Sequence, residues 1–299
     1  MQIGFIGLGK MGMEMATRAV TAGHELIGFD SSENAVAESK NRKIPIVTDL
    51  NELITMLKKH LIIWLQLPPG EITNQMLIAL SEMLDKDDML IDGGNTDFRD
   101  TKVSGQKLKE KGLRFMDIGV SGGMDGAKNG CGMLVGGEKE DYERMIPFFE
   151  ALAAPDAYSY CGGCAAGHYA KTIHNGIQYA VMQAYAEGYE MLCASEINMD
   201  VLGALHAYQN GCSIRSHLLG KMIEALEPDV TLEGIEGFVS DSGMGRWTVE
   251  EATRLKVPTP TISAALQARF RSQQKESPAM QLLAASRGTV GGHPVKHKG

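Results

Sequence analysis

The sequence has 299 residues, 43% of them hydrophobic and 22% charged, with a formal net charge of −8 and an isoelectric point near 5.5. This composition fits a globular protein of one large or two medium domains, and the acidic balance argues against nonspecific binding to nucleic acid or to membrane surfaces. No apolar run of about 18 residues occurs, and no basic leader with a cleavage site precedes the first strand pattern. We therefore expect a cytoplasmic protein.

Short apolar runs alternate with helical patterns through the first half of the chain. The runs end in Gly, Asp or Pro and cover 3–8, 25–30, 60–67, 89–94, 114–119 and 132–137; helical patterns between them include 10–22, 70–84 and 97–111. Such alternation predicts an α/β, Rossmann-type, doubly wound and largely parallel sheet with helices on both faces. We expect this domain to span residues 1–164.

The first predicted strand leads directly into the motif Gly7-Leu8-Gly9-Lys10-Met11-Gly12. A G-x-G-x-x-G pattern after a strand and at the start of a helix is the context of a dinucleotide-binding fingerprint. Gly7 permits the tight turn, Gly9 lets a pyrophosphate approach the backbone, and Gly12 lets the helix pack on the strand. The helix N-terminus supplies amide donors for phosphates. All six residues are predicted to bind NAD or NADP.

The second predicted strand ends in Asp30, 18 residues past Gly12. An acidic side chain here accepts hydrogen bonds from the ribose hydroxyls of NAD and repels the additional phosphate of NADP, so NAD is favoured. Ser31 and Ser32 keep NADP open, because small hydroxyl groups could line a phosphate pocket, although no arginine follows immediately.

Three further loops follow predicted strands, namely LPPG (67–70), DGGNTDFRD (92–100) and VSGGMDGAKNG (120–130). Open α/β sheets bind ligands at the carboxyl ends of their strands. Turn chemistry alone explains some of these glycines. However, Asn95, Ser121, Gly122 and Gly123 are small groups of the kind that a polyhydroxylated ligand and a nicotinamide need. We expect Leu67 and Asn95 to line the cofactor site.

The strand pattern ends near residue 165, and successive helices are predicted over 167–195, 199–210, 214–225, 248–255, 260–273 and 277–286. We place the domain boundary in CGGCAAG and expect an all-α domain over 165–299. The Cys161-x-x-Cys164 pair could serve redox or metal chemistry, but a second ligand pair at zinc-like spacing is missing, so packing in a glycine-rich hinge is favoured. Five cysteines without a regular framework suit a reducing compartment.

A polar stripe interrupts the long helix that begins near residue 167. Lys171, His174, Asn175 and Gln178 follow the i, i+3, i+4, i+7 spacing that places side chains on one helical face. A solvated face of an amphipathic helix is the simple interpretation, and a functional site is the alternative.

Four segments together resemble the decarboxylating 6-phosphogluconate dehydrogenases in their short bacterial form: GLGKMG, IDGGNTDFRDT, VSGGMDGAKNG and GHYAKTIHNGIQY. The resemblance runs essentially end to end. Other β-hydroxyacid dehydrogenases share the Rossmann half, the Ser-Gly-Gly loop and a lysine on the long helix. The DGGN loop and the His-Asn-Gly after Lys171 point to the 6-phosphogluconate dehydrogenases, and imine reductases lack that lysine.

The resemblance implies that the polar stripe lines the cleft between the domains. It implies oxidation of 6-phosphogluconate at its 3-hydroxyl, reduction of NAD or NADP, and loss of carbon dioxide to give ribulose 5-phosphate. Neutral Lys171, with a pKa lowered by burial and by a neighbouring cation, would take the hydroxyl proton and then stabilise the enediol oxyanion. His174 and Asn175 would position the substrate together with Asn95 and the Ser-Gly-Gly loop. No metal site is expected.

Gln178 departs from the family pattern, which has a glutamate there. That acid is assigned the protonation of carbon 1, and an amide has no proton to transfer near neutral pH, so we expect impaired but not absent turnover. Water or another acid could substitute. The alternatives are a dinucleotide- and sugar-phosphate-binding protein with vestigial catalysis, or another β-hydroxyacid dehydrogenase.

Four residues match family positions around the substrate phosphate: Tyr179, Arg269, Arg287 and His293. In the family the last two come from a neighbouring subunit, which implies a homodimer or homotetramer with shared active sites. The loop DSGMGRWT (241–248) carries Met244 between its glycines, where the long form of the family has a lysine-containing insertion. A substrate contact from this loop is therefore open.

Overall fold

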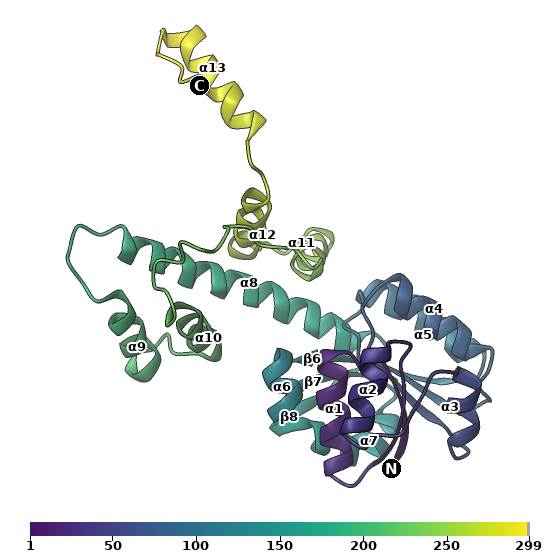
Figure 1. Cartoon of the computed structure of the whole chain (residues 1–299). Coiled ribbons are helices and arrows are strands. Elements are labelled where there is room, and N and C mark those ends of the chain that lie inside the picture. Colours follow the sequence, from purple (N-terminus) through teal and green to yellow (C-terminus); the bar gives the residue numbers. More distant parts are fainter. Residues whose placement is uncertain (298–299) are drawn as a thin grey trace. The chain divides into compact units, whose positions relative to one another are not determined.

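The computed structural model describes residues 1–297 and divides into two compact units, the first over Met1–His174 and the second beginning at Asn175. The first unit is coloured purple to teal in Figure 1, and the second runs from teal to yellow. The sequence-based boundary after residue 164 falls just before the long helix, whose first turns pack within the first unit. That boundary stays a prediction.

The first unit is built on an eight-stranded sheet with the order β3-β2-β1-β4-β5-β6-β7-β8. Every neighbouring pair is parallel except β6 and β7. The strands are β1 (Gln2–Ile6), β2 (Glu25–Phe29), β3 (Ile46–Val47), β4 (Ile62–Leu65), β5 (Met89–Asp92), β6 (Arg114–Ser121), β7 (Cys131–Gly137) and β8 (Ala153–Gly162). The order changes direction beside β1, so the turn after β1 lies where such sheets bind ligands.

Helices lie on both faces of this sheet (Figure 1). They are α1 (Lys10–Thr21), α2 (Glu33–Asn41), α3 (Leu50–Met56), α4 (Glu71–Ser81), α5 (Phe98–Glu110), α6 (Gly123–Asn129) and α7 (Lys139–Leu152). Alternate strand residues point to opposite faces, and two separate cores result. Phe5 belongs to one core and Ile6 to the other. The doubly wound Rossmann-type prediction is confirmed.

Trp64 on β4 is the largest fully buried side chain of the first core. Its ring stacks on Phe5 with centroids 6.1 Å apart, and its indole N–H donates to Gln66 Oε1 at 3.1 Å. A Cβ at Gly93 would lie only 2.7 Å from the indole nitrogen. Gly93, directly after β5, therefore makes room for the tryptophan.

Within residues 166–297 all regular elements are helices, as the sequence predicts. They are α8 (Ala166–Cys193), α9 (Val201–Gly211), α10 (His217–Leu226), α11 (Met244–Leu255), α12 (Pro260–Ser272) and α13 (Pro278–Gly291). Two small cores hold the second unit. One joins α9 and α10 through Leu205, Leu219, Ile223 and Leu226, and the other packs Tyr179 on Ala265 and Leu266 of α12.

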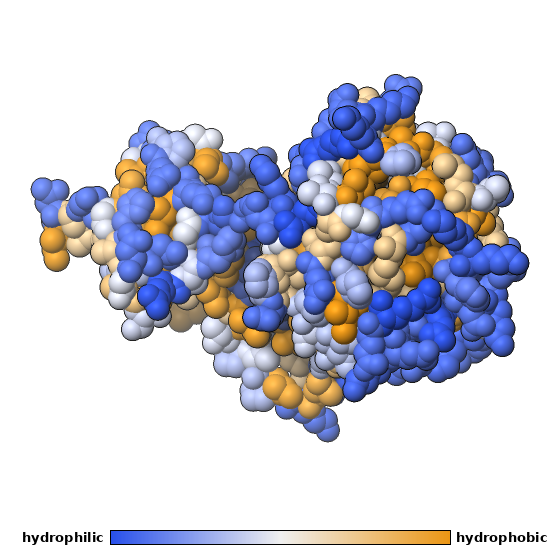
Figure 2. All heavy atoms as spheres, turned by 90° about the horizontal axis from the view of Figure 1, so that it is seen from below, coloured by the Kyte–Doolittle hydropathy of each residue, from blue (hydrophilic) through white to orange (hydrophobic). Residues whose placement is uncertain are grey.

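Helix α13 has no buried residue. On α11, the side chain of Trp247 is half-buried and packs against Gly243. The face of the molecule in Figure 2 is largely hydrophilic, with hydrophobic patches between the polar groups. Across residues 1–297 no helix has both the length and the apolar character needed to span a membrane.

Candidate active site

The glycine turn after β1 has the close contacts that a dinucleotide fingerprint predicts. Gly7 has a φ of 95°, and a Cβ there would lie 2.5 Å from the carbonyl oxygen of Gln66. A Cβ at Gly12 would lie 2.0 Å from the carbonyl oxygen of Gly7. Gly9 precedes α1 and has no atom within 4 Å of its Cβ position. Glycine is therefore needed at 7 and 12 for the fold, whereas Gly9 leaves open backbone for a pyrophosphate.

Asp30 ties this turn to the end of β2. Its Oδ2 accepts the amide of Leu8 at 2.8 Å, and its Oδ1 accepts the amide of Ser32 at 2.9 Å. The carboxylate is thus held at the place where an adenosine ribose is expected. Ser31 and Lys10 are exposed beside it, and Met11 is half-buried. The residues present fit a nicotinamide dinucleotide.

The loop after β5 holds Asn95 in a left-handed conformation, with a φ of 57°. Buried Asp92 braces this loop by accepting the Gly94 amide at 2.8 Å and the Thr96 hydroxyl at 2.6 Å. Asn95 Nδ2 donates to the carbonyl of Val120 at 3.2 Å, and its Oδ1 is buried without a partner among the described residues. Asn95 Oδ1 is therefore an acceptor whose hydrogen-bonding capacity is unused among the described residues. The loop also packs closely on Leu67, another predicted cofactor residue, because a Cβ at Gly94 would lie 2.6 Å from the carbonyl oxygen of Leu67.

Lys171 is 5% exposed on the second turn of α8. Burial lowers the pKa of its amino group to about 8. The predicted contribution of a neighbouring cation is wrong, because burial is the cause of this shift and no cation within the described residues contributes to it. An amine with this pKa is uncharged often enough near neutral pH to accept a proton.

The turn after β6 lies next to this lysine. A Cβ at Gly119 would lie 2.3 Å from Cβ of Lys171, so α8 packs directly on the strand. Ser121 Oγ and His174 Nε2 are 3.4 Å apart, a long hydrogen-bond distance. Gly122 and Gly123 have φ values of 111° and 57° and begin α6. The first unit thus brings Lys171, His174 and the Ser-Gly-Gly turn together.

The second unit gathers another part of the predicted set. Asn175 Nδ2 donates to Sδ of Met244, and Gln178 Nε2 lies 3.8 Å from Sδ of Met182. The guanidinium of Arg269 lies 3.5 Å from the ring centroid of Tyr179. This places a cation against the aromatic face.

The hydroxyl of Tyr179 lies 3.3 Å from that of Ser242, and Arg269 Nη1 donates to the carbonyl of Ser240 at 3.0 Å. Loop 241–248 therefore contacts Tyr179 through Ser242, and Ser240 directly before the loop contacts Arg269. Arg287 and His293 are exposed on and after α13, and the structure does not bring them to the other members of the set within the second unit.

Three buried residues beside the site escape the sequence analysis. Asp117, Thr101 and His168 are at most 1% exposed, and His168 Nδ1 lies 2.8 Å from the Thr101 hydroxyl. A sequence signal exists for Asp117 alone, because an aspartate within the apolar run RFMDIG is unusual.

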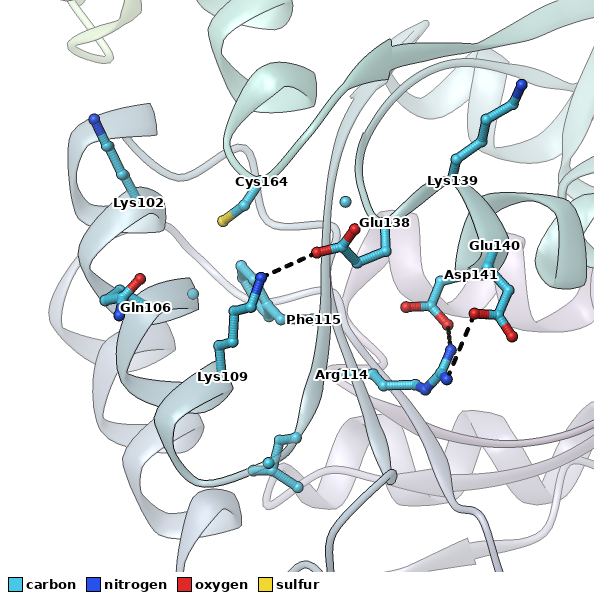
Figure 3. Close-up of a pocket in the computed structure, with 14 residues that line it drawn as sticks. Lys102, Gln106, Lys109, Arg114, Phe115, Glu138, Lys139, Glu140, Asp141 and Cys164 are labelled. Carbon is cyan, nitrogen blue, oxygen red and sulfur yellow. Dashed lines mark hydrogen bonds and ion pairs between the residues drawn. The ribbon is translucent and has the colours of Figure 1, made fainter.

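A cavity of about 740 Å³ lies elsewhere in the first unit, between α5, the start of β6 and the start of α7 (Figure 3). Its ionic groups are largely paired, Lys109 with Glu138 and Arg114 with Asp141. Cys164 forms one wall, and burial raises its pKa to about 11. Burial raises the pKa of Cys161 as well, so both are protonated thiols at neutral pH, which disfavours a reactive redox pair.

The fold and this arrangement define a two-part nicotinamide dinucleotide-binding dehydrogenase. Residues 2–167 match the NAD binding domain of 6-phosphogluconate dehydrogenase, and residues 167–290 match the C-terminal domain of the same enzyme. The chain belongs to the 6-phosphogluconate dehydrogenase family.

Named relatives agree with this assignment. The chain is 36% identical to an NAD(+)-dependent, decarboxylating 6-phosphogluconate dehydrogenase of Haloferax volcanii, over 100% of this chain and 99% of the relative. It is 34% identical to an NADP(+)-dependent, decarboxylating enzyme of Bacillus subtilis, over 92% of this chain and 62% of that longer protein.

A solved structure of Plasmodium falciparum 6-phosphogluconate dehydrogenase, described in complex with NADP+ and with 6-phosphogluconate, matches 100% of this chain and 66% of its own. The TM-score is 0.84 and the identity 26%.

Proposed function

We propose that this protein oxidises 6-phosphogluconate at its 3-hydroxyl and releases carbon dioxide and ribulose 5-phosphate, with NAD as the preferred electron acceptor and NADP as a weaker one. The observation that carries the proposal is Lys171, an amine with a pKa of about 8 buried against Gly119 beside the Ser-Gly-Gly turn. Its amino group is the base for the hydroxyl proton. A cytoplasmic location remains a prediction from the sequence.

Oxidation requires a proton acceptor and a hydride acceptor for the same alcohol. A bound nicotinamide supplies the hydride acceptor. Roughly a tenth of Lys171 is uncharged at pH 7, given its pKa of about 8, and this fraction takes the proton. The resulting ammonium then donates to the oxyanion that develops as carbon dioxide leaves. Asn95, whose Oδ1 has no partner among the described residues, is proposed to accept a hydrogen bond from the substrate or from the nicotinamide amide.

The last step needs a proton on carbon 1, and Gln178 cannot supply it. We propose that water or another acid delivers this proton slowly, so that oxidation outruns formation of ribulose 5-phosphate. The second candidate function, a binding protein with vestigial catalysis, rests on Gln178 alone.

Substrate phosphate is proposed to bind Tyr179 and Arg269, with Arg287 and His293 supplied by a second copy of the chain. The exposed apolar side chains of α13 support such an assembly, with Met280 56%, Leu282 68% and Val290 89% exposed. A single helix without a buried face is not stable alone, so burial against a partner is expected.

Formation of NADH from NAD and 6-phosphogluconate, followed at the same time as carbon dioxide and ribulose 5-phosphate, tests the function. We expect turnover that Lys171→Met abolishes. A short β-hydroxy acid without phosphate serves as the contrasting substrate. If it is oxidised faster than 6-phosphogluconate, the chain is another β-hydroxyacid dehydrogenase; if both ligands bind without any NADH, catalysis is vestigial.

A further inference from the structure

The carboxylate of Asp117 joins the middle of β6 to the first turn of α8. Its Oδ1 accepts the amide of Ala165 at 2.7 Å, and its Oδ2 accepts the amide of His168 at 2.8 Å. Asp117 is 0% exposed. The first amides of a helix have no partner within the helix, so this side chain caps α8 from a neighbouring strand.

Strand β6 and helix α8 contact each other at three successive points. Asp117, Gly119 and Ser121 alternate along the strand, so they share one face of the sheet. Along α8 they meet the amide of His168, the Cβ of Lys171 and the ring of His174. These three helix residues are spaced by three and therefore lie on adjoining parts of one helical surface. The Asp117 contact is the only one of the three with two short hydrogen bonds.

The glycines around this contact leave little freedom for any other position of the helix. A Cβ at Gly167 would lie 2.4 Å from the carbonyl oxygen of Leu134 and 2.5 Å from that of Asp117. A Cβ at Gly136 would lie 2.7 Å from the amide nitrogen of Gly167. Helix and sheet therefore meet backbone to backbone, where a small slide of α8 moves Lys171 by the same amount.

We infer that Asp117 is a positioning residue, whose buried carboxylate fixes the register of α8 on β6 and so places Lys171 and His174 beside the Ser-Gly-Gly turn. Its use in catalysis rests on the proposed function, whereas the register itself does not. The side chain of Asp117 accepts hydrogen bonds from the amides of Ala165 and His168 at the start of α8, so it acts through that helix.

The ionised form of Asp117 suits this task. Both of its oxygens accept an N–H, and a protonated carboxyl would lose one of these acceptors. Burial raises the pKa of Asp117, while the two amides and His168 act in the opposite direction. A second tie reinforces the register, because the side chain of His168 reaches the Thr101 hydroxyl of α5 at 2.8 Å.

Asp117→Asn is the test, because it keeps the shape but turns one acceptor into an NH₂ group facing an amide. Asp88→Asn is the matched control. Asp88 is 4% exposed and also accepts two backbone amides, those of Leu61 at 2.8 Å and Asp85 at 2.9 Å, at the opposite end of β5 from the candidate site. Both substitutions remove the same kind of bond from a buried carboxylate.

The first readout is hydrogen exchange of the peptide covering 165–172, which needs no substrate. We expect faster exchange there in Asp117→Asn than in wild type, and no change there in Asp88→Asn. The second readout is kinetic, per active site counted by NADH titration. The kcat of Asp117→Asn should fall at least ~10-fold while the KM for NAD is unchanged, because a small misplacement of a catalytic group is costly.

Unchanged exchange at 165–172 in Asp117→Asn overturns the inference, even if the enzyme is active as proposed. Faster exchange with kcat kept also overturns the catalytic part. A wild-type protein without turnover refutes the proposed function instead, and the exchange comparison still decides the register. If Asp117→Asn does not fold, Asp117→Ser replaces it. In wild type, amides of 165 and 168 that exchange as fast as a frayed helix end refute the cap without any variant.

Discussion

In the proposed reaction the amino group of Lys171 must be uncharged at the moment when it accepts the hydroxyl proton. Its pKa of about 8 predicts that the reaction rate changes with pH around that value, because only the neutral amine accepts the hydroxyl proton. We expect kcat/KM for 6-phosphogluconate to rise through pH 7 and level off above about 8. A rate profile measured with NAD checks this, and a flat profile from pH 6 to 9 would exclude Lys171 as the base.

The same burial means that Lys171 lowers the free energy of unfolding. The pKa falls from 10.5 in the unfolded chain to about 8 in the folded one, so the folded state disfavours the proton. The cost is full below pH 8, shrinks as the pH rises, and vanishes above the unfolded pKa. Lys171→Met should therefore raise the free energy of unfolding by up to ~3 kcal/mol at pH 7. Denaturant melts at pH 7 and pH 10 test this, since the gain must diminish at pH 10.

Gln178→Glu tests the missing proton donor. A glutamic acid at this position can protonate carbon 1, and general acid catalysis is worth about 10² to 10⁴-fold. We expect faster formation of ribulose 5-phosphate and a smaller change in the oxidation step, as resolved by single-turnover NADH formation. Gln183→Glu, a similar change further along α8, is the control. An equal rate in wild type and Gln178→Glu would show that another acid already serves.

At this scale local sequence patterns indicate candidate residues, whose roles stay predictions, and they miss residues that would act through other residues. Spacing indicates Gly7, Asp30 and the polar stripe that contains Lys171, because fingerprints and helical stripes are local patterns. The catalytic role of Lys171 follows only from the family resemblance. Asp117 and His168 are far apart in the sequence, and their contact exists only after β6 and α8 have packed. No local pattern encodes such a contact.

At the scale of elements, close packing of α8 on β6 depends on glycine at position 119, which has no side chain. Gly119→Ala would place a Cβ 2.3 Å from that of Lys171, so helix or strand must shift. Overpacking of this kind costs ~1–3 kcal/mol, and we expect a lower Tm together with a lower kcat. Gly188→Ala in α8 is the control: the added Cβ meets no atom within 4 Å, so this change should slightly raise the Tm. A normal kcat in Gly119→Ala would show that the register tolerates displacement.

The main strands were predictable because buried parallel strands read as apolar runs between turn residues. β3 was missed because it has two residues, and β8 because its sequence AAPDAYSYCG is half-exposed and contains proline. α7 was missed although its apolar residues contact the first core, since Pro147 interrupts the helical pattern. The secondary structure of these segments is determined by the elements that they pack against rather than by their own composition.

At the scale of the whole molecule, the apolar surface of α13 predicts self-association. Leu282→Glu should lower the sedimentation mass, because it puts a charge at a side chain that is 68% exposed in the single chain. Ile72→Glu, at a 56% exposed position of α4, is the control and should leave the mass unchanged. Identical masses for wild type and Leu282→Glu would remove α13 from the interface.

Shared sites make a sharper prediction for hybrids. Lys171→Met and Arg287→Ala chains should each be nearly inactive alone. In a hybrid, one site carries both defects and the other carries neither, so co-folded mixtures should recover activity. Recovery that follows the hybrid fraction on native separation supports exchange of the terminal pair between copies. Mixtures that stay inactive would confine each site to one chain.

The two tryptophans fall one in each compact unit, Trp64 buried in the sheet and Trp247 half-buried on α11. The fluorescence of each tryptophan therefore reports on one compact unit alone. A pair of single-tryptophan proteins, Trp64→Phe and Trp247→Phe, would report the melting of the two halves by separate emission signals. Coincident curves would mean that the long helix α8 couples both halves into one cooperative transition.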